Sequence, residues 1–249
     1  MKRSVKFRGA ALLCLILLVT LLASSCAHNR RQRQGSYGYK SPQYSTRTHA
    51  PQHTTSRGYH RGGVLDNNPG VWLSDNSRVR KFRTHYRGTN TVEIGLNKGA
   101  KYLPHITRVF RAKGLPLELA YLPILESFWD PRANSGVARG LWQFTRGTAR
   151  EMGLHVGGFG DERLNWRKST EAAADYLLQL GAQFNYDWAL ALAAYNGGPG
   201  YITRSMKKQG AQDYFSLRLV QETYEYVPRF VAMVQVAKEK YPHLLIAAR

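Results

Sequence analysis

The sequence predicts an all-α fold. Apolar residues recur at three-to-four spacing, as in residues 101–113, which places them on one face of a helix. Residues 116–126 and 188–196 are apolar on nearly every side, which is typical of buried helices. No run of alternating apolar and polar residues is long enough to organise a sheet, and no segment of roughly 20 to 50 residues repeats. We therefore expect packed helices rather than a sheet or a solenoid.

The composition supports a packed core and a cationic chain. The 249 residues include 43% hydrophobic and 12% aromatic side chains, and the length allows one or two domains. The formal net charge is +20 at pH 7, and a charge of this size concerns partners and solubility rather than fold. Such a basic chain suggests nucleic acid as a partner, but the export signal described next argues against it.

Residues 1–25 are predicted to be an export signal. A basic start precedes an apolar run over 10–22, which is shorter than a membrane span of about 20 residues. Small residues and then Cys26 follow, which resembles a bacterial lipoprotein signal and implies a lipid anchor on Cys26. The only other cysteine, Cys14, would leave with the signal, so Cys26 would otherwise be an unpaired thiol. A plain signal-peptidase cut after Ser25 and an uncleaved anchor remain alternatives. The predicted location is the periplasm, with a tether to the outer membrane.

Residues 26–63 are predicted to be a disordered basic linker. They are rich in Arg, His, Gln, Ser, Gly and Tyr, contain no Asp or Glu, and hold too few apolar residues to offset the entropy of ordering. Attraction to an anionic surface, such as lipid headgroups or cell wall, is one interpretation. A spacer kept soluble by its charge is the other.

Residues 64–249 form the predicted helical domain, which turn and cap residues divide. Pro116 fits the first turn of a helix, and Ser169 and Asp187 are expected to begin two others. Pro228 is expected to bend the last helix. The expected helices cover residues 75–87, 92–96, 101–113, 116–126, 145–153, 172–184, 188–196, 201–209 and 221–241.

The apolar helix over 116–126 ends on one acid, Glu126. Burial disfavours the charged form of a carboxyl and raises its pKa, which makes a general acid usable near neutral pH. Pro123 is expected to kink the helix and aim its last turn. On spacing alone, a solvated helix end is the commoner role of such a residue.

Short motifs follow this acid in a fixed order. They are Glu126-Ser127, Asp130-Pro131, GLWQF at 140–144, AYNGGPG at 194–200, and Glu222-Thr223 with YVP at 226–228. Together they resemble the soluble-lytic-transglycosylase family, most closely its membrane-bound lytic murein transglycosylase D group. The resemblance runs from about residue 72 to about residue 237. It implies a lysozyme-like helical catalytic domain with additional N-terminal helices, and peptidoglycan glycan strands as the partner.

The resemblance also implies a mechanism with one acid. Glu126 would protonate the bridging oxygen between muramic acid and glucosamine units, and its carboxylate would then accept a proton from the muramoyl C6 hydroxyl. That hydroxyl would close on C1 and leave a 1,6-anhydro end. The substrate's N-acetyl group would stabilise the cationic centre. Ordinary glycosidases use two carboxyl groups, so a hydrolytic, lysozyme-like muramidase is one alternative, and an inert peptidoglycan-binding protein is another.

The remaining site residues are expected from the same resemblance. Ser127, Gln143 and Asn196 would bond to the sugar or hold Glu126, and Tyr226 would orient the acid. Further substrate contacts are expected from Ser135 and Tyr195.

The sequence departs from the family pattern near this loop. The segment between Glu126 and Gly140 is one residue shorter than usual, Arg139 replaces a small residue, and Arg146 replaces a proline. The shorter segment and Arg139 weaken the assignment of Ser135.

Other chemistry is not indicated. Asp130 precedes a proline at a turn, so a structural cap is its expected role, while Asp161, Glu162 and Glu222 have no spacing argument. Trp129 and Trp142 are expected to pack rather than to stack on sugars. No His/Cys cluster suggests a metal, no phosphate-binding loop is present, and no cofactor is expected.

Overall fold

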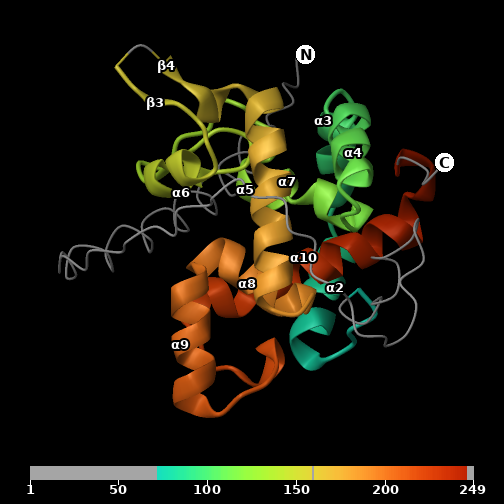
Figure 1. Ribbon diagram of the computed structural model, residues 1–249. Helices are drawn as coiled ribbons and strands as arrows, with labels where there is room; N and C mark the ends of the chain where they lie inside the picture. Colours follow the sequence, from blue (N-terminus) through green and yellow to red (C-terminus); the bar gives the residue numbers. More distant parts are fainter. Residues whose placement is uncertain (1–71, 159, 246–249) are drawn as a thin grey trace, which may run out of the picture.

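The structure is a computed structural model that describes residues 72–158 and 160–245 (Figure 1). Helices dominate this part of the chain, so the all-α prediction is confirmed. The predicted signal, the linker and Cys26 lie outside the described residues. The helices are α2 (Ser77–Arg87), α3 (Thr91–Gly99), α4 (Leu103–Ala112), η1 (Leu117–Tyr121), α5 (Pro123–Glu126), α6 (Arg146–Glu151), η2 (Glu162–Leu164), α7 (Trp166–Gln183), α8 (Trp188–Gly197), α9 (Pro199–Gln209), η3 (Tyr214–Ser216), α10 (Gln221–Lys240) and η4 (Pro242–Leu244).

Strands are a minor part of the described residues. Strands β1 (Ala138–Arg139) and β2 (Phe144–Thr145) form one antiparallel pair, and β3 (Val156–Gly157) and β4 (Gly160–Asp161) form another. The first pair closes the loop after Glu126, and the second forms the hairpin at the edge of the molecule in Figure 1. None of the helices in the described ranges combines the length and the apolar character that a membrane crossing needs.

Helix α8 lies at the centre of the core. Every residue from 188 to 194 is buried, and the helix packs against α7, α9 and α10. Asp187 begins it as predicted, since its carboxylate accepts hydrogen bonds from the backbone N–H groups of Ala189 at 2.9 Å and Leu190 at 3.0 Å. Gly198 ends it with φ +90°, a conformation that favours glycine. The all-apolar sequence therefore predicted the burial of this helix correctly.

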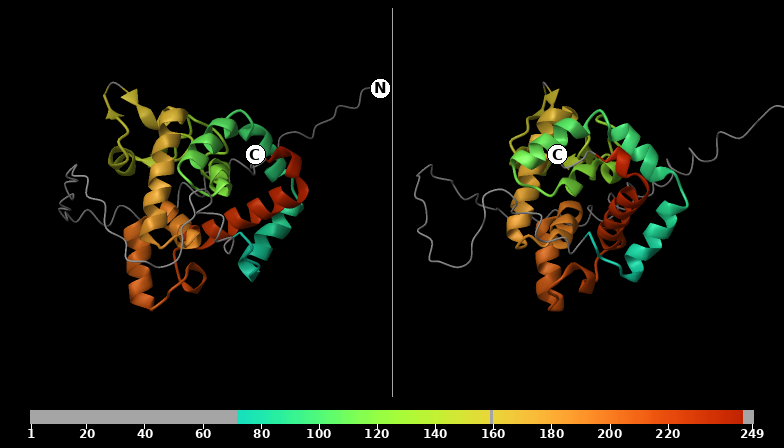
Figure 2. Two further views of the ribbon diagram at one scale, coloured as in Figure 1. Left: turned by 45° about the vertical axis from the view of Figure 1, so that its right-hand side comes forward. Right: turned by 90° about the vertical axis from the view of Figure 1, so that its right-hand side faces the viewer.

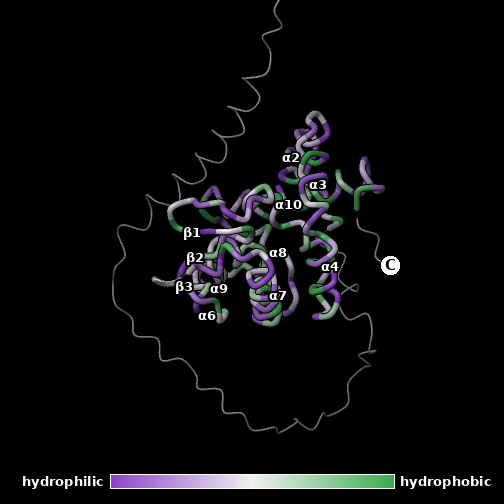
Figure 3. Tube along the Cα trace, turned by 90° about the horizontal axis from the view of Figure 1, so that it is seen from above, coloured by the Kyte–Doolittle hydropathy of each residue, from purple (hydrophilic) through white to green (hydrophobic). Residues whose placement is uncertain are grey.

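Helix α4 shows the amphipathic pattern that the sequence predicted. Leu103, Ile106, Val109 and Phe110 are all buried. In Figure 3 the tube of α4 changes between purple and green along its length, as expected for a helix with one apolar face. Its buried face packs against η1 and α7. The helix that precedes the acid is therefore anchored to the core.

The N-terminal helix α2 packs along the last long helix, α10 (Figure 2). The amide of Gln235 donates hydrogen bonds to the carbonyls of Trp72 at 3.0 Å and Ser74 at 2.9 Å. The guanidinium of Arg78 lies 4.2 Å from the centroid of the Tyr224 ring, which adds a cation–π attraction. The additional N-terminal helices thus fix the position of α10.

The predicted continuous helix over 116–126 is wrong in detail. The chain forms the 3₁₀ helix η1 and then the single turn α5, with Leu122 N–H bonded to the Leu119 carbonyl at 3.1 Å. Pro123 occupies the first turn of α5, where its missing N–H costs nothing, so it begins a helix instead of kinking one. Leu119, Leu122 and Pro123 are buried, so the predicted burial is confirmed.

The predicted cap at Ser169 is also wrong. Helix α7 begins at Trp166, and the side chain of Asn165 accepts hydrogen bonds from the N–H groups of Arg167 at 3.1 Å and Lys168 at 3.2 Å. Asn is at least as good an N-cap as Ser, so the earlier residue begins the helix. Ser169 is fully buried inside α7.

Removal of the Asp187 side chain tests whether it caps α8 and stabilises the core helix. Asp187→Ala deletes the acceptor for two backbone N–H groups and is expected to lower the free energy of unfolding by about 1 kcal/mol. Denaturation followed by circular dichroism measures this change. Asp187→Asn keeps an acceptor oxygen and should remain close to the wild type. Equal stability of Asp187→Ala and the wild type would contradict the assignment.

Candidate active site

The centre of the candidate site is a hydrogen bond between two helices. Glu126 is the last residue of α5, and its Oε1 accepts a hydrogen bond from the hydroxyl of Tyr226, which α10 carries. Tyr226 is buried, whereas Glu126 is partly buried. The structure therefore brings together two predicted residues that are 100 positions apart in the chain. Glu126 is therefore sheltered, although the residue as a whole is not fully buried.

The surroundings of Glu126 change its protonation. Burial raises its pKa from the ordinary 4.5 to about 7, the hydrogen bond from Tyr226 acts in the opposite direction, and the negative charge of Glu222 raises the pKa further. A carboxyl with this pKa can both give and take a proton near neutral pH. Burial raises the pKa of Tyr226 well above its ordinary value, so its hydroxyl remains a donor.

Tyr195 borders the same carboxyl. Its hydroxyl donates to the carbonyl oxygen of Trp142 at 2.8 Å, which joins the end of α8 to the segment before β2. Burial raises the pKa of Tyr195 well above its ordinary value, and the charge of Glu126 adds to this shift. Tyr195 thus belongs to the surroundings of Glu126 and fixes the 140–144 motif.

Asn196 links the end of α8 to α10. Its amide nitrogen lies 3.4 Å from Oε1 of Glu222, and its amide oxygen accepts a hydrogen bond from the Thr223 hydroxyl at 2.9 Å. A Cβ on Gly197 would lie 2.9 Å from the Thr223 hydroxyl oxygen, so glycine is needed for this close approach. The AYNGGPG motif and the Glu-Thr motif therefore meet in space.

Glu222 is a residue of the site that the sequence placed in a motif but to which it assigned no role. Its charge acts on both Glu126 and Tyr226. Glu222 and Tyr226 are four residues apart on α10, a spacing that places both on one helix face. Since Tyr226 was expected to orient the acid, the four-residue spacing could have predicted that Glu222 also faces Glu126.

Three predicted residues contact the loop rather than the acid. The Ser127 hydroxyl donates to the Leu141 carbonyl at 2.9 Å. Ser135 accepts from the Ala138 N–H at 3.0 Å, and the amide of Gln143 donates to the Gly140 carbonyl at 2.8 Å. Among the described residues, the hydrogen bonds of these three side chains reach neither Glu126 nor each other. They position the loop over residues 130–143 beside the site.

The other acids near the site have structural partners. Asp130 is exposed and accepts a hydrogen bond from the Arg132 N–H at 2.8 Å, so its predicted role as a turn cap is confirmed. Asp161 binds the buried guanidinium of Arg163, which holds the pKa of that carboxyl below its ordinary value. Glu162 accepts from the His155 N–H at 2.7 Å.

The two tryptophans pack, as predicted. Trp142 is fully buried, and its indole N–H donates to the Thr170 hydroxyl at 3.0 Å. Trp129 is buried and stacks on Tyr102, with ring centroids 5.9 Å apart. In the described ranges, no cluster of His, Cys, Asp or Glu could hold a metal ion.

Comparison with known protein families matches residues 106–217 to the transglycosylase SLT domain. The chain carries a transglycosylase SLT domain. The matched residues include Glu126 and the GLWQF and AYNGGPG motifs, so the resemblance that these motifs predicted is confirmed. Tyr226 and Glu222 lie beyond the matched residues. They belong to α10, which packs against the central helix α8.

Two known proteins are similar to parts of this chain. Membrane-bound lytic murein transglycosylase D of Escherichia coli K12 is 34% identical over 172 residues, which cover 67% of this chain and 38% of that protein. A protein of Alteromonas sp. named for tributyltin chloride resistance is 35% identical over 129 residues, 50% of this chain and 62% of that protein. The chain thus spans well under half the length of the Escherichia coli relative.

One solved structure is similar to part of the SLT-domain chain. It is an inactive mutant of the lytic transglycosylase Slt from Pseudomonas aeruginosa, with 26% sequence identity and a TM-score of 0.48. The match covers 57% of this chain and 24% of the Pseudomonas chain.

The raised pKa of Glu126 predicts a pH-dependent stability. The fold favours the protonated carboxyl, so this contribution is present below about pH 4.5 and is lost as the pH rises through about 7. Glutamine cannot ionise, so Glu126→Gln should be more stable than the wild type at pH 8 by roughly 1–3 kcal/mol, with a much smaller difference at about pH 5.

Urea denaturation at the two pH values measures this difference. A gain from Glu126→Gln that is the same at both pH values would contradict a raised pKa. Lower stability of the variant at pH 8 would contradict it as well.

Proposed function

We propose that this protein is a lytic transglycosylase that cleaves the β-1,4 bond between MurNAc and GlcNAc in peptidoglycan. The SLT domain and the similarity to a lytic murein transglycosylase support the reaction class. The observation that carries the proposal is the sheltered carboxyl of Glu126, which has a pKa of about 7 and a tyrosine hydroxyl bonded to it. That carboxyl is half protonated near neutral pH, as a group that acts first as acid and then as base requires.

In the proposed reaction the same carboxyl group first gives a proton and then takes one. Protonated Glu126 gives its proton to the bridging oxygen, and the bond to C1 of the MurNAc unit breaks. The N-acetyl group of that unit stabilises the positive charge that develops at C1. The Glu126 carboxylate then takes the proton of the C6 hydroxyl, whose oxygen bonds to C1. A 1,6-anhydro end forms, no water is consumed, and the acid returns to its starting state.

The chain's own residues hold the acid in place for both steps. Tyr226 donates to Glu126, and this bond stabilises the carboxylate after the first proton transfer. Burial has the opposite effect and favours the acid form. Tyr195 and Asn196 complete the surroundings from α8.

A hydrolytic reaction is the second candidate, and Glu222 is the observation that favours it. Its charge acts on Glu126, and a second carboxylate could activate a water molecule in a muramidase. The two reactions give products of different mass, since an anhydro end is one water lighter than a reducing end. An inert wall-binding protein, the third candidate, would bind sacculi and release nothing.

Replacing the acid tests the proposal. Glu126→Gln is expected to lower the rate of muropeptide release by about 10³-fold, in the range that loss of general acid–base catalysis produces. Glu171→Gln, an exposed carboxyl on α7, is the matched control and should keep the wild-type rate. Mass spectrometry of the released muropeptides should show 1,6-anhydro ends. Reducing ends would replace the proposal with a hydrolase, and full activity of Glu126→Gln would remove the proposed mechanism.

The proposal extends to the location of the protein. Export by residues 1–25 and a lipid on Cys26 would place the domain over 64–249 in the periplasm, tethered to the outer membrane by the basic linker over 26–63. The name of the Escherichia coli relative, which calls it membrane-bound, supports attachment to a membrane. The intact mass of protein extracted from membranes tests this proposal, and an unmodified Cys26 would contradict it.

A further inference from the structure

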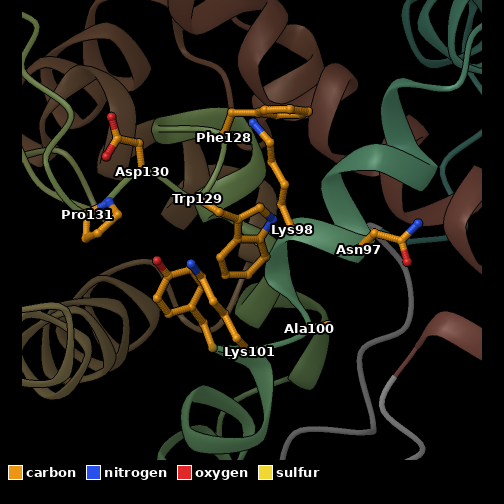
Figure 4. A pocket seen from close by; sticks show the side chains of 9 residues that line it. Asn97, Lys98, Ala100, Lys101, Phe128, Trp129, Asp130 and Pro131 are labelled. Atoms are coloured by element: carbon orange, nitrogen blue, oxygen red, sulfur yellow. The ribbon is translucent and has the colours of Figure 1, made fainter.

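A pocket borders the chain segment that directly follows the acid. Its volume is about 570 Å³. The end of α3 and the start of α4 form one wall, and the chain directly after the acid forms the other (Figure 4). Glu126 and Tyr226 do not line it. The lining residues are Asn97, Lys98, Ala100, Lys101, Tyr102, Phe128, Trp129, Asp130 and Pro131.

The wall after the acid is held in an unusual backbone conformation. Phe128 and Trp129 both have positive φ, +49° and +65°, although neither is glycine. Each such residue costs on the order of 1 kcal/mol, and strain of this kind is found at functional sites. A Cβ on Gly99 would lie 2.6 Å from the ring of Trp129, so the tryptophan packs directly on the α3 backbone. The pocket is therefore built into the fold.

Two lysines give the pocket a positive charge. The ammonium of Lys98 lies 4.3 Å from the centroid of the Phe128 ring, and that of Lys101 lies 4.9 Å from the centroid of Tyr102. Both lysines are exposed, and neither takes part in an ion pair within the described ranges. The one acid of the wall, Asp130, is engaged by the Arg132 N–H. The pocket thus offers two cations against one carboxylate.

The aromatic faces in the pocket are not free to bind a sugar ring. Trp129 and Tyr102 are buried and stacked on one another at 8°, and Lys98 covers the face of Phe128 that it approaches. Ammonium groups that have no ion-pair partner in the described ranges and lie beside small apolar surfaces suit a peptide that carries carboxylates and short side chains. A flat membrane surface fits a concave site poorly.

We propose that this pocket binds the carboxylate-bearing peptide stem of the peptidoglycan strand, which rests on the proposed function. Lys98 and Lys101 pair with stem carboxylates while the glycan lies at Glu126. Only Ser127 separates the acid from Phe128, so a stem in the pocket contacts the segment that directly follows the acid. Strands that carry stems are therefore cleaved faster than strands without them.

Binding of a free stem peptide tests the pocket without any cleavage. Isothermal titration of the full chain with the purified stem tetrapeptide is expected to show binding that Lys98→Ala/Lys101→Ala weakens at least tenfold. Lys207→Ala/Lys208→Ala removes the same charge from two exposed lysines of α9 and should bind as the wild type does. No binding to the wild type, or equal binding to both double variants, would overturn the proposal.

Cleavage assays on two substrates then distinguish the role of the pocket from that of the catalytic acid. On stem-bearing strands, kcat/KM of Lys98→Ala/Lys101→Ala should fall about tenfold, whereas on strands stripped of stems by an amidase it should equal that of the wild type. An equal fall on both substrates would overturn the proposal. Stem binding that depends on the two lysines, in a chain that cleaves neither substrate, would refute the proposed function and leave the pocket assignment standing. Lysine-dependent binding to phosphatidylglycerol vesicles but not to the stem would assign the pocket to a membrane instead.

Discussion

The hydrogen bond between Tyr226 and Glu126 is the interaction on which the site depends, because it joins the last long helix to the short turn that carries the acid. Helix α10 is held on one side by α2 and on the other by α8. The acid's turn is held by α3 and by η1. These helices together therefore set the separation of the two side chains. Burial favours the protonated acid and the tyrosine favours the carboxylate, and the net result is a pKa of about 7.

Most other polar groups near the acid maintain the local structure. Asp161 compensates the buried charge of Arg163, which also donates to the Phe144 carbonyl and so supports β2. Gly140 has φ +83°, and a Cβ there would lie 1.8 Å from the Arg163 carbonyl oxygen, so this glycine permits the close approach of the two segments. The shortened loop before Gly140 is thus fixed at its end. The polar groups left for chemistry and binding are Glu126, Glu222 and the two lysines of the neighbouring pocket.

Sequence reasoning predicted the parts of the molecule that periodicity and composition determine. The apolar faces of α4 and α8 identified buried helices, and the resemblance identified Glu126 and its partner Tyr226. The prediction from sequence was wrong where two local structures are both compatible with the residues. Residues 116–126 divide into η1 and α5 instead of forming one helix, and Asn165 instead of Ser169 caps α7. The prediction also missed the effect of Glu222 on the acid, since that depends on how α10 crosses α5. The left-handed turn at Phe128 has no signal in the sequence, because it is set by the packing of Trp129 on Gly99.

A titration of the Glu126 carboxyl itself tests most directly whether the fold shelters this acid. Carbon-13 NMR of protein labelled at glutamate side chains, with the Glu126→Gln spectrum to assign the resonance, measures its pKa. We expect a pKa of about 7 for Glu126, and a further rise in Tyr226→Phe because the hydroxyl that stabilises the carboxylate is gone. A value near the ordinary 4.5, unchanged in Tyr226→Phe, would show a solvated carboxylate and would contradict a sheltered acid held by Tyr226.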